Sequence, residues 1–479
     1  MKISIKSIRI AAAVLLVGLV ALPTFAQARG SADFTRFVTL GDSYGAGFES
    51  GGLTERHQEW SWPAVIARQA GLQICPANAT AAQNCFAIPR VSYPGIPAEL
   101  VLGGLTVGPV SQSGQGAPIM LNFGRPYNNL AVPGATTAAV LALTGAEPQT
   151  PNDSTPVIYS RFILRGLGTQ VQQALVQQPT FIALWIGGND YLGAALAGTP
   201  AALTSVADFK TRYEAILNQL TAGAPNAGFV VGNLPDNVPP YFTLVPPYLV
   251  NPSTGAPVLD PTGARIYYVA DLGGGNFGQL PVGSYVTLDA RAQLAQGYGI
   301  PAAFKTIPPF SALPHVGEPL ADRYALTPAE FTAITTRVGE YNTIISQAAA
   351  AKNIPVADVA GLFDRVYAGM PLGPISINSA FVSGGFFSYD GFHLTDLGYL
   401  LMGNEYIKTI NQAYDTEIPL AGIAQLYADN GAFFGQDSAT FNVNAESIVF
   451  ADGVAEQLRQ NWAARSMAEP SRRFRAVGH

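Results

Sequence analysis

The stretch FVTLGDSYGAG, residues 37–47, decides the fold of this chain. It begins with a short apolar run that is typical of a buried strand, and it continues directly into a turn flanked by glycines. An open parallel sheet places its functional loops at the carboxyl ends of its strands. Ser43 therefore occupies a position at which a nucleophile could be presented. Taken alone, Gly-Asp-Ser is equally typical of an ordinary turn or of a helix N-cap.

Four further apolar runs alternate with helical patterns along the chain. The expected strands cover residues 36–41, 129–132, 181–187, 228–234 and 354–359. The helical patterns cover residues 61–70, 137–143, 162–177, 206–220, 328–351 and 395–413. Strands that alternate with helices in this way predict a parallel sheet covered by helices on both faces.

Two long segments interrupt this alternation, at residues 45–127 and 235–324. They are rich in Gly, Pro or aromatic residues, and we interpret them as loop insertions at the edge of the sheet. The sequence thus predicts one main domain over residues 29–419. A C-terminal extension, residues 420–479, carries a helical pattern at 447–464, and we expect it to be loosely attached.

The composition excludes several classes of protein. Hydrophobic residues make up 48% of the 479 residues, which excludes an intrinsically disordered chain. Charged residues make up only 12%, about half of the usual share, and the formal net charge is −6. A negative chain with few basic residues is a poor partner for nucleic acids and other polyanions.

The first 28 residues are typical of a secretory signal peptide. Lys2, Lys6 and Arg9 form a basic start, an apolar stretch follows at residues 10–22, and Ala-Gln-Ala at 26–28 forms a cleavage site. A transmembrane anchor is the alternative, but the apolar stretch is shorter than the ~20 residues that span a bilayer. We therefore expect export to the periplasm or beyond, and no membrane-spanning segment in the mature chain.

The chain has two cysteines, Cys75 and Cys85, which lie close together in the first insertion. In an oxidising compartment we expect them to form one disulfide that closes a small loop. Two free thiols are the alternative.

A nucleophilic serine needs a general base, and the chain offers four histidines: His57, His315, His393 and His479. His393 stands apart because Asp390 lies three residues upstream, just before a helix that Thr395 is placed to cap. Such a loop could supply both the base and the carboxylate that orients it. For this loop taken alone, a capping Asp beside an incidental His is the alternative.

Two other strand ends carry groups that could stabilise a negatively charged oxygen. Asn189 follows the third expected strand in WIGGND, and Gly134 follows the second in NLAVPGA. A side-chain amide and a backbone N–H can both donate to an oxyanion. Taken singly, each residue is also typical of a turn.

Read in order, Gly-Asp-Ser, Asn-x-x-x-x-Gly, Gly-x-Asn-Asp and Asp-x-x-His resemble the motifs of the GDSL, or SGNH, hydrolases, a family of esterases and lipases. The resemblance implies a three-layer α/β/α fold with a five-stranded parallel, flavodoxin-like sheet and long loop insertions. Tyr44 stands where the family has Leu, and Leu394 stands where it commonly has Pro. Neither change removes a functional atom, but both leave the subfamily and the substrate open.

The resemblance also implies a role for each motif residue. Ser43 would be the nucleophile, His393 the base and Asp390 the residue that orients it. The oxyanion hole would consist of the backbone N–H groups of Ser43 and Gly134 and the side-chain amide of Asn189.

The reaction expected from these residues is hydrolysis of a carboxylic ester through an acyl-enzyme on Ser43. No metal or organic cofactor is expected, because the sequence has no His-rich or Cys-rich ligand cluster and no phosphate-binding glycine loop with a Lys. Hydrolysis of polysaccharide acetyl esters is an alternative, and a non-catalytic secreted binding protein of the same fold is another. The oligomeric state is left open.

Aromatic residues of the second insertion could form an apolar wall that accommodates the acyl chain of a lipid or short-chain ester. They are Tyr241, Phe242, Tyr248, Tyr267, Tyr268 and Tyr285. Packing of the insertion onto the sheet explains these aromatics equally well.

Overall fold

A parallel sheet forms the centre of the molecule in the computed structural model, which describes residues 27–110, 114–252, 254–373, 375–430 and 448–462. The strands are β1 (Phe37–Gly41), β4 (Phe181–Trp185), β5 (Gly228–Gly232) and β10 (Val356–Ala357), paired in the order β1-β4-β5-β10. Every residue of β1, β4 and β5 is buried, which explains why these strands are continuous apolar runs. The predicted α/β fold with a parallel sheet is confirmed.

The expected fifth strand, residues 129–132, is not a regular strand and corrects the predicted strand count. This segment runs parallel to β1 with one bridge, between Thr39 and Asn129. The N–H groups of Leu130 and Val132 donate to carbonyl groups of β1 at 2.9 and 3.1 Å. However, the Asn129 side chain accepts the N–H two residues further on, at 3.1 Å, and such local bonds compete with a regular ladder.

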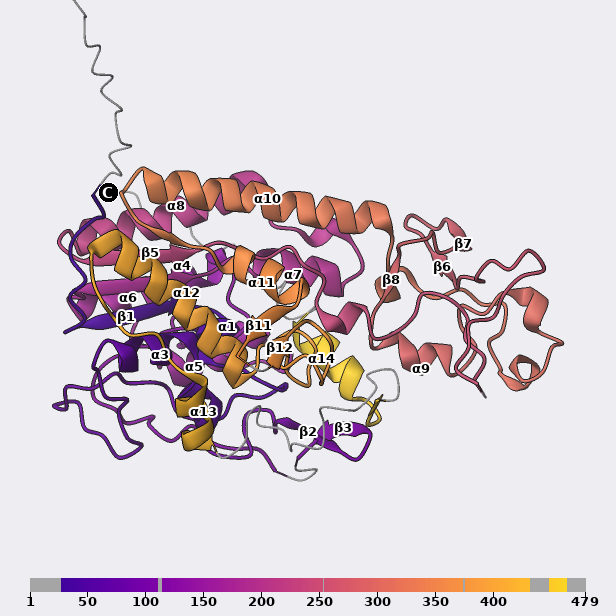
Figure 1. Cartoon of the computed structure of the whole chain (residues 1–479), viewed down its shortest axis with the longest axis horizontal. Helices are drawn as coiled ribbons and strands as arrows, with labels where there is room; N and C mark the ends of the chain where they lie inside the picture. The colour runs from indigo at the N-terminus through magenta and orange to yellow at the C-terminus, as the bar shows by residue number, and fades with distance from the viewer. Residues whose placement is uncertain (1–26, 111–113, 253, 374, 431–447, 463–479) are drawn as a thin grey trace, which may run out of the picture.

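Helices cover both faces of the sheet (Figure 1). One group consists of α3 (Trp62–Gln69), α11 (Val359–Tyr367) and α12 (Asp396–Tyr414). The other consists of α4 (Thr137–Ala142), α6 (Gln170–Val176), α8 (Val206–Gly223) and α10 (Pro328–Ala350). Helix α12 begins directly after Thr395, whose Oγ accepts the N–H of Gly398 at 3.1 Å.

The helix expected at residues 162–177 is two helices, α5 (Thr155–Ile163) and α6. Between them Gly166 and Gly168 have φ angles of +75° and +114°, which a continuous helix does not allow. Thr169 then starts α6 with a reciprocal capping box to Gln172. Local turn chemistry therefore overrides the apolar periodicity.

The first insertion contributes to the helical layer as well as to the surface. Besides α3 it contains α2 (Glu55–Gln58) and the hairpin of β2 (Leu100–Gly103) and β3 (Thr106–Pro109). Cys75 and Cys85 are joined by a disulfide. The bridge packs in a small apolar cluster with Met120, Phe123 and Tyr127.

The second insertion extends from one end of the molecule, where α9, β6 and β7 are seen in Figure 1. Its regular elements are α9 (Ala290–Leu294), β6 (Val269–Asp271), β7 (Phe277–Gln279) and β8 (Tyr285–Val286), with 3₁₀ turns at Pro240–Phe242, Ala302–Phe304, Phe310–Ala312 and Asp322–Tyr324. Strand β8 pairs with β9 (Ala325–Leu326), which leads into α10. Other short elements outside this insertion include a 3₁₀ turn at Pro200–Ala202, β11 (Met370–Leu372) and β12 (Ile375–Ile377).

The described parts of the C-terminal extension are docked onto the body rather than loosely attached. Helix α13 (Ile423–Asn430) packs on α12, and β13 (Val449–Phe450) pairs with β3. Helix α14 (Val454–Trp462) buries Leu458 and Trp462. Burial of these apolar side chains is the physical reason for the attachment.

The described residues include no helix that is both long enough and apolar enough to cross a membrane. The expected signal peptide lies, up to residue 26, outside the described residues.

Candidate active site

The turn after β1 presents Ser43 at the start of a short helix, α1 (Ser43–Ala46). Asp42 caps this helix, because its side chain accepts the N–H of Tyr44 at 3.0 Å. The N–H of the first residue of a helix has no acceptor within the helix, so the Ser43 N–H points outward from the turn. Gly45 permits the turn to close, since a Cβ there would lie 2.7 Å from the side chain of Ala131.

His393 and Asp390 form a buried pair in the loop before α12. The Nδ1 atom of His393 lies 2.7 Å from Oδ2 of Asp390, and the two side chains are 1% and 0% exposed. Oδ1 of Asp390 also accepts the N–H groups of Phe392 and His393 at 3.0 and 2.8 Å. This geometry places a proton on Nδ1 and leaves the lone pair on Nε2, the arrangement that a general base requires.

The pKa of Asp390 is lower than the usual value for an aspartate. Burial alone would raise it, but the adjacent His393 and the hydrogen bonds from two backbone N–H groups outweigh that effect. Asp390 therefore stays ionised and can balance a positive charge on His393.

Two residues that the sequence analysis did not identify hold Asp390 in place. The N–H of Gly51 donates to its Oδ2 at 2.9 Å, and the hydroxyl of Ser388 donates to its Oδ1 at 3.2 Å. The N–H of Ser50 in turn donates to the Ser388 hydroxyl at 2.9 Å. The segment that follows the Ser43 helix thus supports the carboxylate that orients His393. Small residues in a glycine-rich loop give no sequence signal for this role.

Tyr44, which replaces the usual Leu, connects the two halves of the site. Its hydroxyl donates to the carbonyl of Phe392 at 2.6 Å, and its ring lies 5.8 Å from that of His393. Because Ser43 precedes Tyr44 and His393 follows Phe392, this bond brings both motifs to the same edge of the sheet. Leu394, which replaces the usual Pro, is buried.

Asn189 and Gly134 also lie close together at this edge. Asn189 begins α7 (Asn189–Leu196), and its amide donates one N–H to the carbonyl of Ala135 at 3.0 Å. A side-chain amide carries two N–H bonds, so a second remains for another acceptor. Asp190 fixes the turn that contains Gly134, because it accepts the N–H and the hydroxyl of Thr137 at 2.9 and 2.8 Å. Gly134 has a φ of +78°, which favours glycine.

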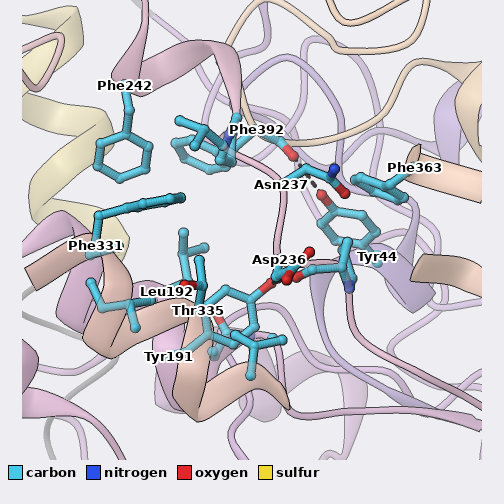
Figure 2. Close-up of a pocket in the computed structure, with 18 of the residues that line it drawn as sticks. Tyr44, Tyr191, Leu192, Asp236, Asn237, Phe242, Phe331, Thr335, Phe363 and Phe392 are labelled. Carbon is cyan, nitrogen blue, oxygen red and sulfur yellow. Dashed lines mark hydrogen bonds between the residues drawn. The ribbon is translucent and has the colours of Figure 1, made fainter. Parts of the chain in front are cut away.

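A largely apolar pocket opens beside Ser43 and Asn189 (Figure 2). Of the six aromatics expected to form its wall, only Phe242 and Tyr285 line it, while the other four do not. Helix α10 supplies a further part of the wall that the sequence analysis missed, including Phe331, Ile334, Thr335 and Val338. Their spacing along one helix is a periodic signal, but it is equally typical of core packing.

Aromatic side chains cover the imidazole of His393. The ring centres of Phe48, Phe392 and Trp462 lie 4.7, 4.8 and 4.8 Å from that of His393. Trp462 belongs to α14, which is fastened to the second insertion by an ion pair of 2.7 Å between Arg459 Nε and Asp289 Oδ2. The C-terminal extension is therefore part of the wall of the site.

Neither His57 nor His315 joins this site. His57 is buried among carboxylates behind the Ser43 turn, with its Nδ1 3.0 Å from Asp396 Oδ1. His315 stacks on Tyr298 in the second insertion, with ring centres 4.2 Å apart. His479 lies outside the described residues.

Comparison with known proteins gives one family match. Residues 37–274 match the family model described as GDSL-like Lipase/Acylhydrolase. This range contains Ser43, Gly134 and Asn189 and ends before Asp390. No curated protein matches the chain.

Several solved structures are similar to this chain at low identity. The lipase/acylhydrolase from Enterococcus faecalis is 13% identical, covers 81% of this chain and 100% of its own, and has a TM-score of 0.32. Phospholipase A1 from Streptomyces albidoflavus NA297 is 18% identical, covers 81% and 100%, and has a TM-score of 0.29. The family 3 carbohydrate esterase from Clostridium thermocellum is 12% identical, covers 79% and 96%, and has a TM-score of 0.28. Because these TM-scores are low, the family assignment depends on the family model alone.

Proposed function

We propose that this chain, whose residues 37–274 belong to the GDSL-like lipase/acylhydrolase family, cleaves carboxylic esters through an acyl-enzyme on Ser43. The family match agrees with the sequence-based prediction of an ester-cleaving hydrolase. One observation carries the assignment of residues: the buried pair of His393 and Asp390, at 2.7 Å, is tied to the turn that presents Ser43.

In the proposed mechanism, the hydroxyl of Ser43 attacks the ester carbonyl carbon while Nε2 of His393 takes its proton. Asp390 keeps Nδ1 protonated and balances the charge of the imidazolium. The N–H groups of Ser43 and Gly134 and the amide of Asn189 stabilise the oxyanion. The alcohol leaves with the proton from His393, and a water activated by the same imidazole then hydrolyses the acyl-enzyme.

Replacement of Asn189 by Ala is expected to lower kcat by on the order of 10²- to 10³-fold, because one oxyanion donor is lost. Steady-state kinetics on nitrophenyl butyrate would measure the change. Asn237→Ala provides the matched control, since Asn237 lines the same pocket but has no role in the proposed oxyanion hole. An Asn189→Ala variant with the wild-type kcat would remove Asn189 from the mechanism.

We propose that the pocket beside Ser43 binds the acyl chain. Phe242, Phe331 and Phe392 surround it, and burial of an alkyl chain against such rings is favourable. Short-chain or lipid esters therefore fit the site better than the acetyl groups of a polysaccharide, which would leave the pocket empty.

A tryptophan at Thr335 tests this assignment, because Thr335 is a half-buried residue of α10 that lines the pocket (Figure 2). Thr335→Trp is expected to lower kcat/KM for nitrophenyl butyrate and palmitate by about 10-fold or more relative to acetate. Thr336→Trp is the control, since Thr336 is exposed on the same helix. An unchanged chain-length profile would contradict an acyl pocket here. Inactivity on all three esters, with acetate released from acetylated xylan, would favour the polysaccharide alternative.

We further propose that the protein is exported to the periplasm or beyond. The signal-like leader at residues 1–28 supports export, as does the disulfide between Cys75 and Cys85, since disulfides persist in oxidising compartments. Activity and the Cys75–Cys85 bond measured in the culture medium and the periplasmic fraction would locate the mature protein.

A further inference from the structure

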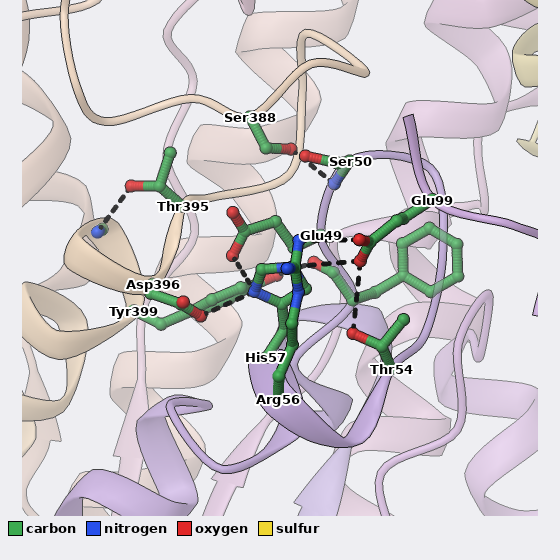
Figure 3. Close-up of polar contacts among 12 residues, drawn as sticks. Glu49, Ser50, Thr54, Arg56, His57, Glu99, Ser388, Thr395, Asp396 and Tyr399 are labelled. Atoms are coloured by element: carbon green, nitrogen blue, oxygen red, sulfur yellow. Dashed lines mark hydrogen bonds and ion pairs between the residues drawn. The ribbon is translucent and has the colours of Figure 1, made fainter. Parts of the chain in front are cut away.

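A second buried polar cluster lies behind the Ser43 turn, formed by Glu49, His57 and Asp396 (Figure 3). The Nδ1 atom of His57 lies 3.0 Å from Asp396 Oδ1 and 3.1 Å from Glu49 Oε2. One ligand-type atom from each of the three residues lies within 4.8 Å of the other two. All three side chains are at most 3% exposed. None of them takes part in the proposed mechanism.

The hydrogen bonds within this cluster leave one oxygen of Glu49 without a donor. A ring nitrogen carries either one proton or one lone pair, yet two carboxylate oxygens face Nδ1 of His57. Glu49 Oε2 is fully buried and has no hydrogen-bond partner among the described residues. A buried carboxylate oxygen without a donor is strongly unfavourable, so this oxygen points to a missing positive partner.

The second ring nitrogen of His57, Nε2, faces a carboxylate, as the second ring nitrogen of a metal-binding histidine commonly does. Nε2 lies 3.3 Å from Glu99 Oε2, and Glu99 is itself paired with Arg56 at 2.7 Å. Metal-binding histidines commonly donate their second ring N–H to a carboxylate, which turns the lone pair of the first nitrogen toward the metal. Arg56 Nε also approaches Nε2, at 3.1 Å, and this contact favours the other tautomer when no metal is bound.

We propose that Glu49 Oε2, His57 Nδ1 and Asp396 Oδ1 bind a divalent transition-metal ion, with Zn²⁺ or Mn²⁺ as the best match to one imidazole and two carboxylates. Spacings of 3.0 and 3.1 Å between the nitrogen and the two oxygens suit a cation roughly 2.0–2.2 Å from each. The role of this ion is structural. It joins the segment after the Ser43 helix to the first turn of α12, which follows His393.

The position of the site explains how it would affect the active centre without touching a substrate. Glu49 lies between Phe48, which packs on the ring of His393, and Ser50 and Gly51, whose N–H groups support Ser388 and Asp390. An ion bound to Glu49 and Asp396 would fix both segments at once. Sequence analysis could not predict the site, because His57 and Asp396 are separated by 339 positions.

The test measures metal binding directly and does not depend on esterase activity. Protein without an affinity tag would be produced in medium supplemented with ZnCl₂ and MnCl₂, desalted, and analysed by inductively coupled plasma mass spectrometry. We expect about one metal ion per wild-type chain, and at least a tenfold lower content in Glu49→Gln. His315→Gln is the control, since His315 and Glu318 form an exposed pair that could bind zinc adventitiously. This control variant should retain the wild-type content.

A second measurement keeps the proposal falsifiable if Glu49→Gln does not fold. Dipicolinic acid should lower the melting temperature of the wild type, and readdition of the same metal should restore it, because a ligand that binds only the folded state stabilises it. Glu99→Gln should weaken metal binding by about 10- to 100-fold, as the loss of other carboxylate partners of metal-binding histidines does. Wild-type protein without metal, or equal metal contents in the wild type and Glu49→Gln, would overturn the proposal. Loss of Ser43-dependent hydrolysis with metal binding intact would instead count against the proposed function alone.

Discussion

Replacement of Ser43 by Ala is expected to lower kcat on nitrophenyl butyrate by on the order of 10⁴-fold or more, with little change in stability. Alanine removes only the hydroxyl that attacks the carbonyl carbon. The backbone N–H of residue 43 remains at the start of α1, so part of the oxyanion hole survives. Initial rates of the two purified proteins, compared with the uncatalysed reaction, would measure the loss.

Ser61→Ala is the matched control for this experiment. Ser61 is also a buried serine at the start of a helix, and its hydroxyl donates to the carbonyl of Gln58 at 2.8 Å. Its removal should leave kcat within a few-fold of the wild type. A fluorophosphonate should label Ser43 in the wild type and in Ser61→Ala but not in Ser43→Ala. Hydrolysis by Ser43→Ala at the wild-type rate would place the nucleophile elsewhere, and a wild type that neither reacts nor hydrolyses esters would favour the binding-protein alternative.

Replacement of Asp390 by Asn is expected to lower kcat by on the order of 10⁴-fold, although the side chain keeps its size. Oδ1 accepts two backbone N–H groups, so the oxygen of the new amide should take that position. The NH₂ group would then face Nδ1 of His393, and it would hold the imidazole in the tautomer whose Nε2 carries the proton. That tautomer cannot accept a proton from Ser43.

The pH dependence of the wild type follows from the lowered pKa of Asp390. A carboxyl group whose pKa is lower in the folded state stabilises the fold above its unfolded pKa, near 4, and this contribution is lost as the pH falls through the folded pKa. If kcat falls as the pH is lowered through the neutral and mildly acidic range, protonation of Asp390 should therefore not be the cause of that fall.

Kinetics of Asp390→Asn and of Asp236→Asn, a control in the same pocket, would separate loss of orientation from loss of a nearby charge. An equal loss in both variants would contradict the orienting role.

The features that the sequence predicted are those with a local or periodic signature. The buried strands are continuous apolar runs, and parallel pairing then sends their carboxyl ends to one edge, where Ser43 and Asn189 both lie. Asp390 and His393 are three residues apart, so one turn brings them together. Where the prediction was wrong, single residues overrode the pattern, as with Asn129 beside β1 and the glycines between α5 and α6.

The features that the sequence did not reveal depend on single contacts between distant segments. The hydrogen bond from Tyr44 to the carbonyl of Phe392 and the one from Gly51 to Asp390 each join positions more than three hundred residues apart. Trp462 reaches His393 only because α14 docks on the body. Such contacts leave no spacing or periodicity in the sequence, so only the folded chain reveals them.

The docking of α14 has a consequence for the order in which the protein is made. A ribosome builds the chain from its amino end, so the segments that carry Ser43, Asn189 and His393 are all synthesised before Trp462. The imidazole of His393 therefore lacks part of its aromatic cover throughout most of translation and gains it when α14 folds back. The aromatic cover of the proposed catalytic histidine is thus completed late in synthesis, and a chain stalled before α14 would present an incompletely covered histidine.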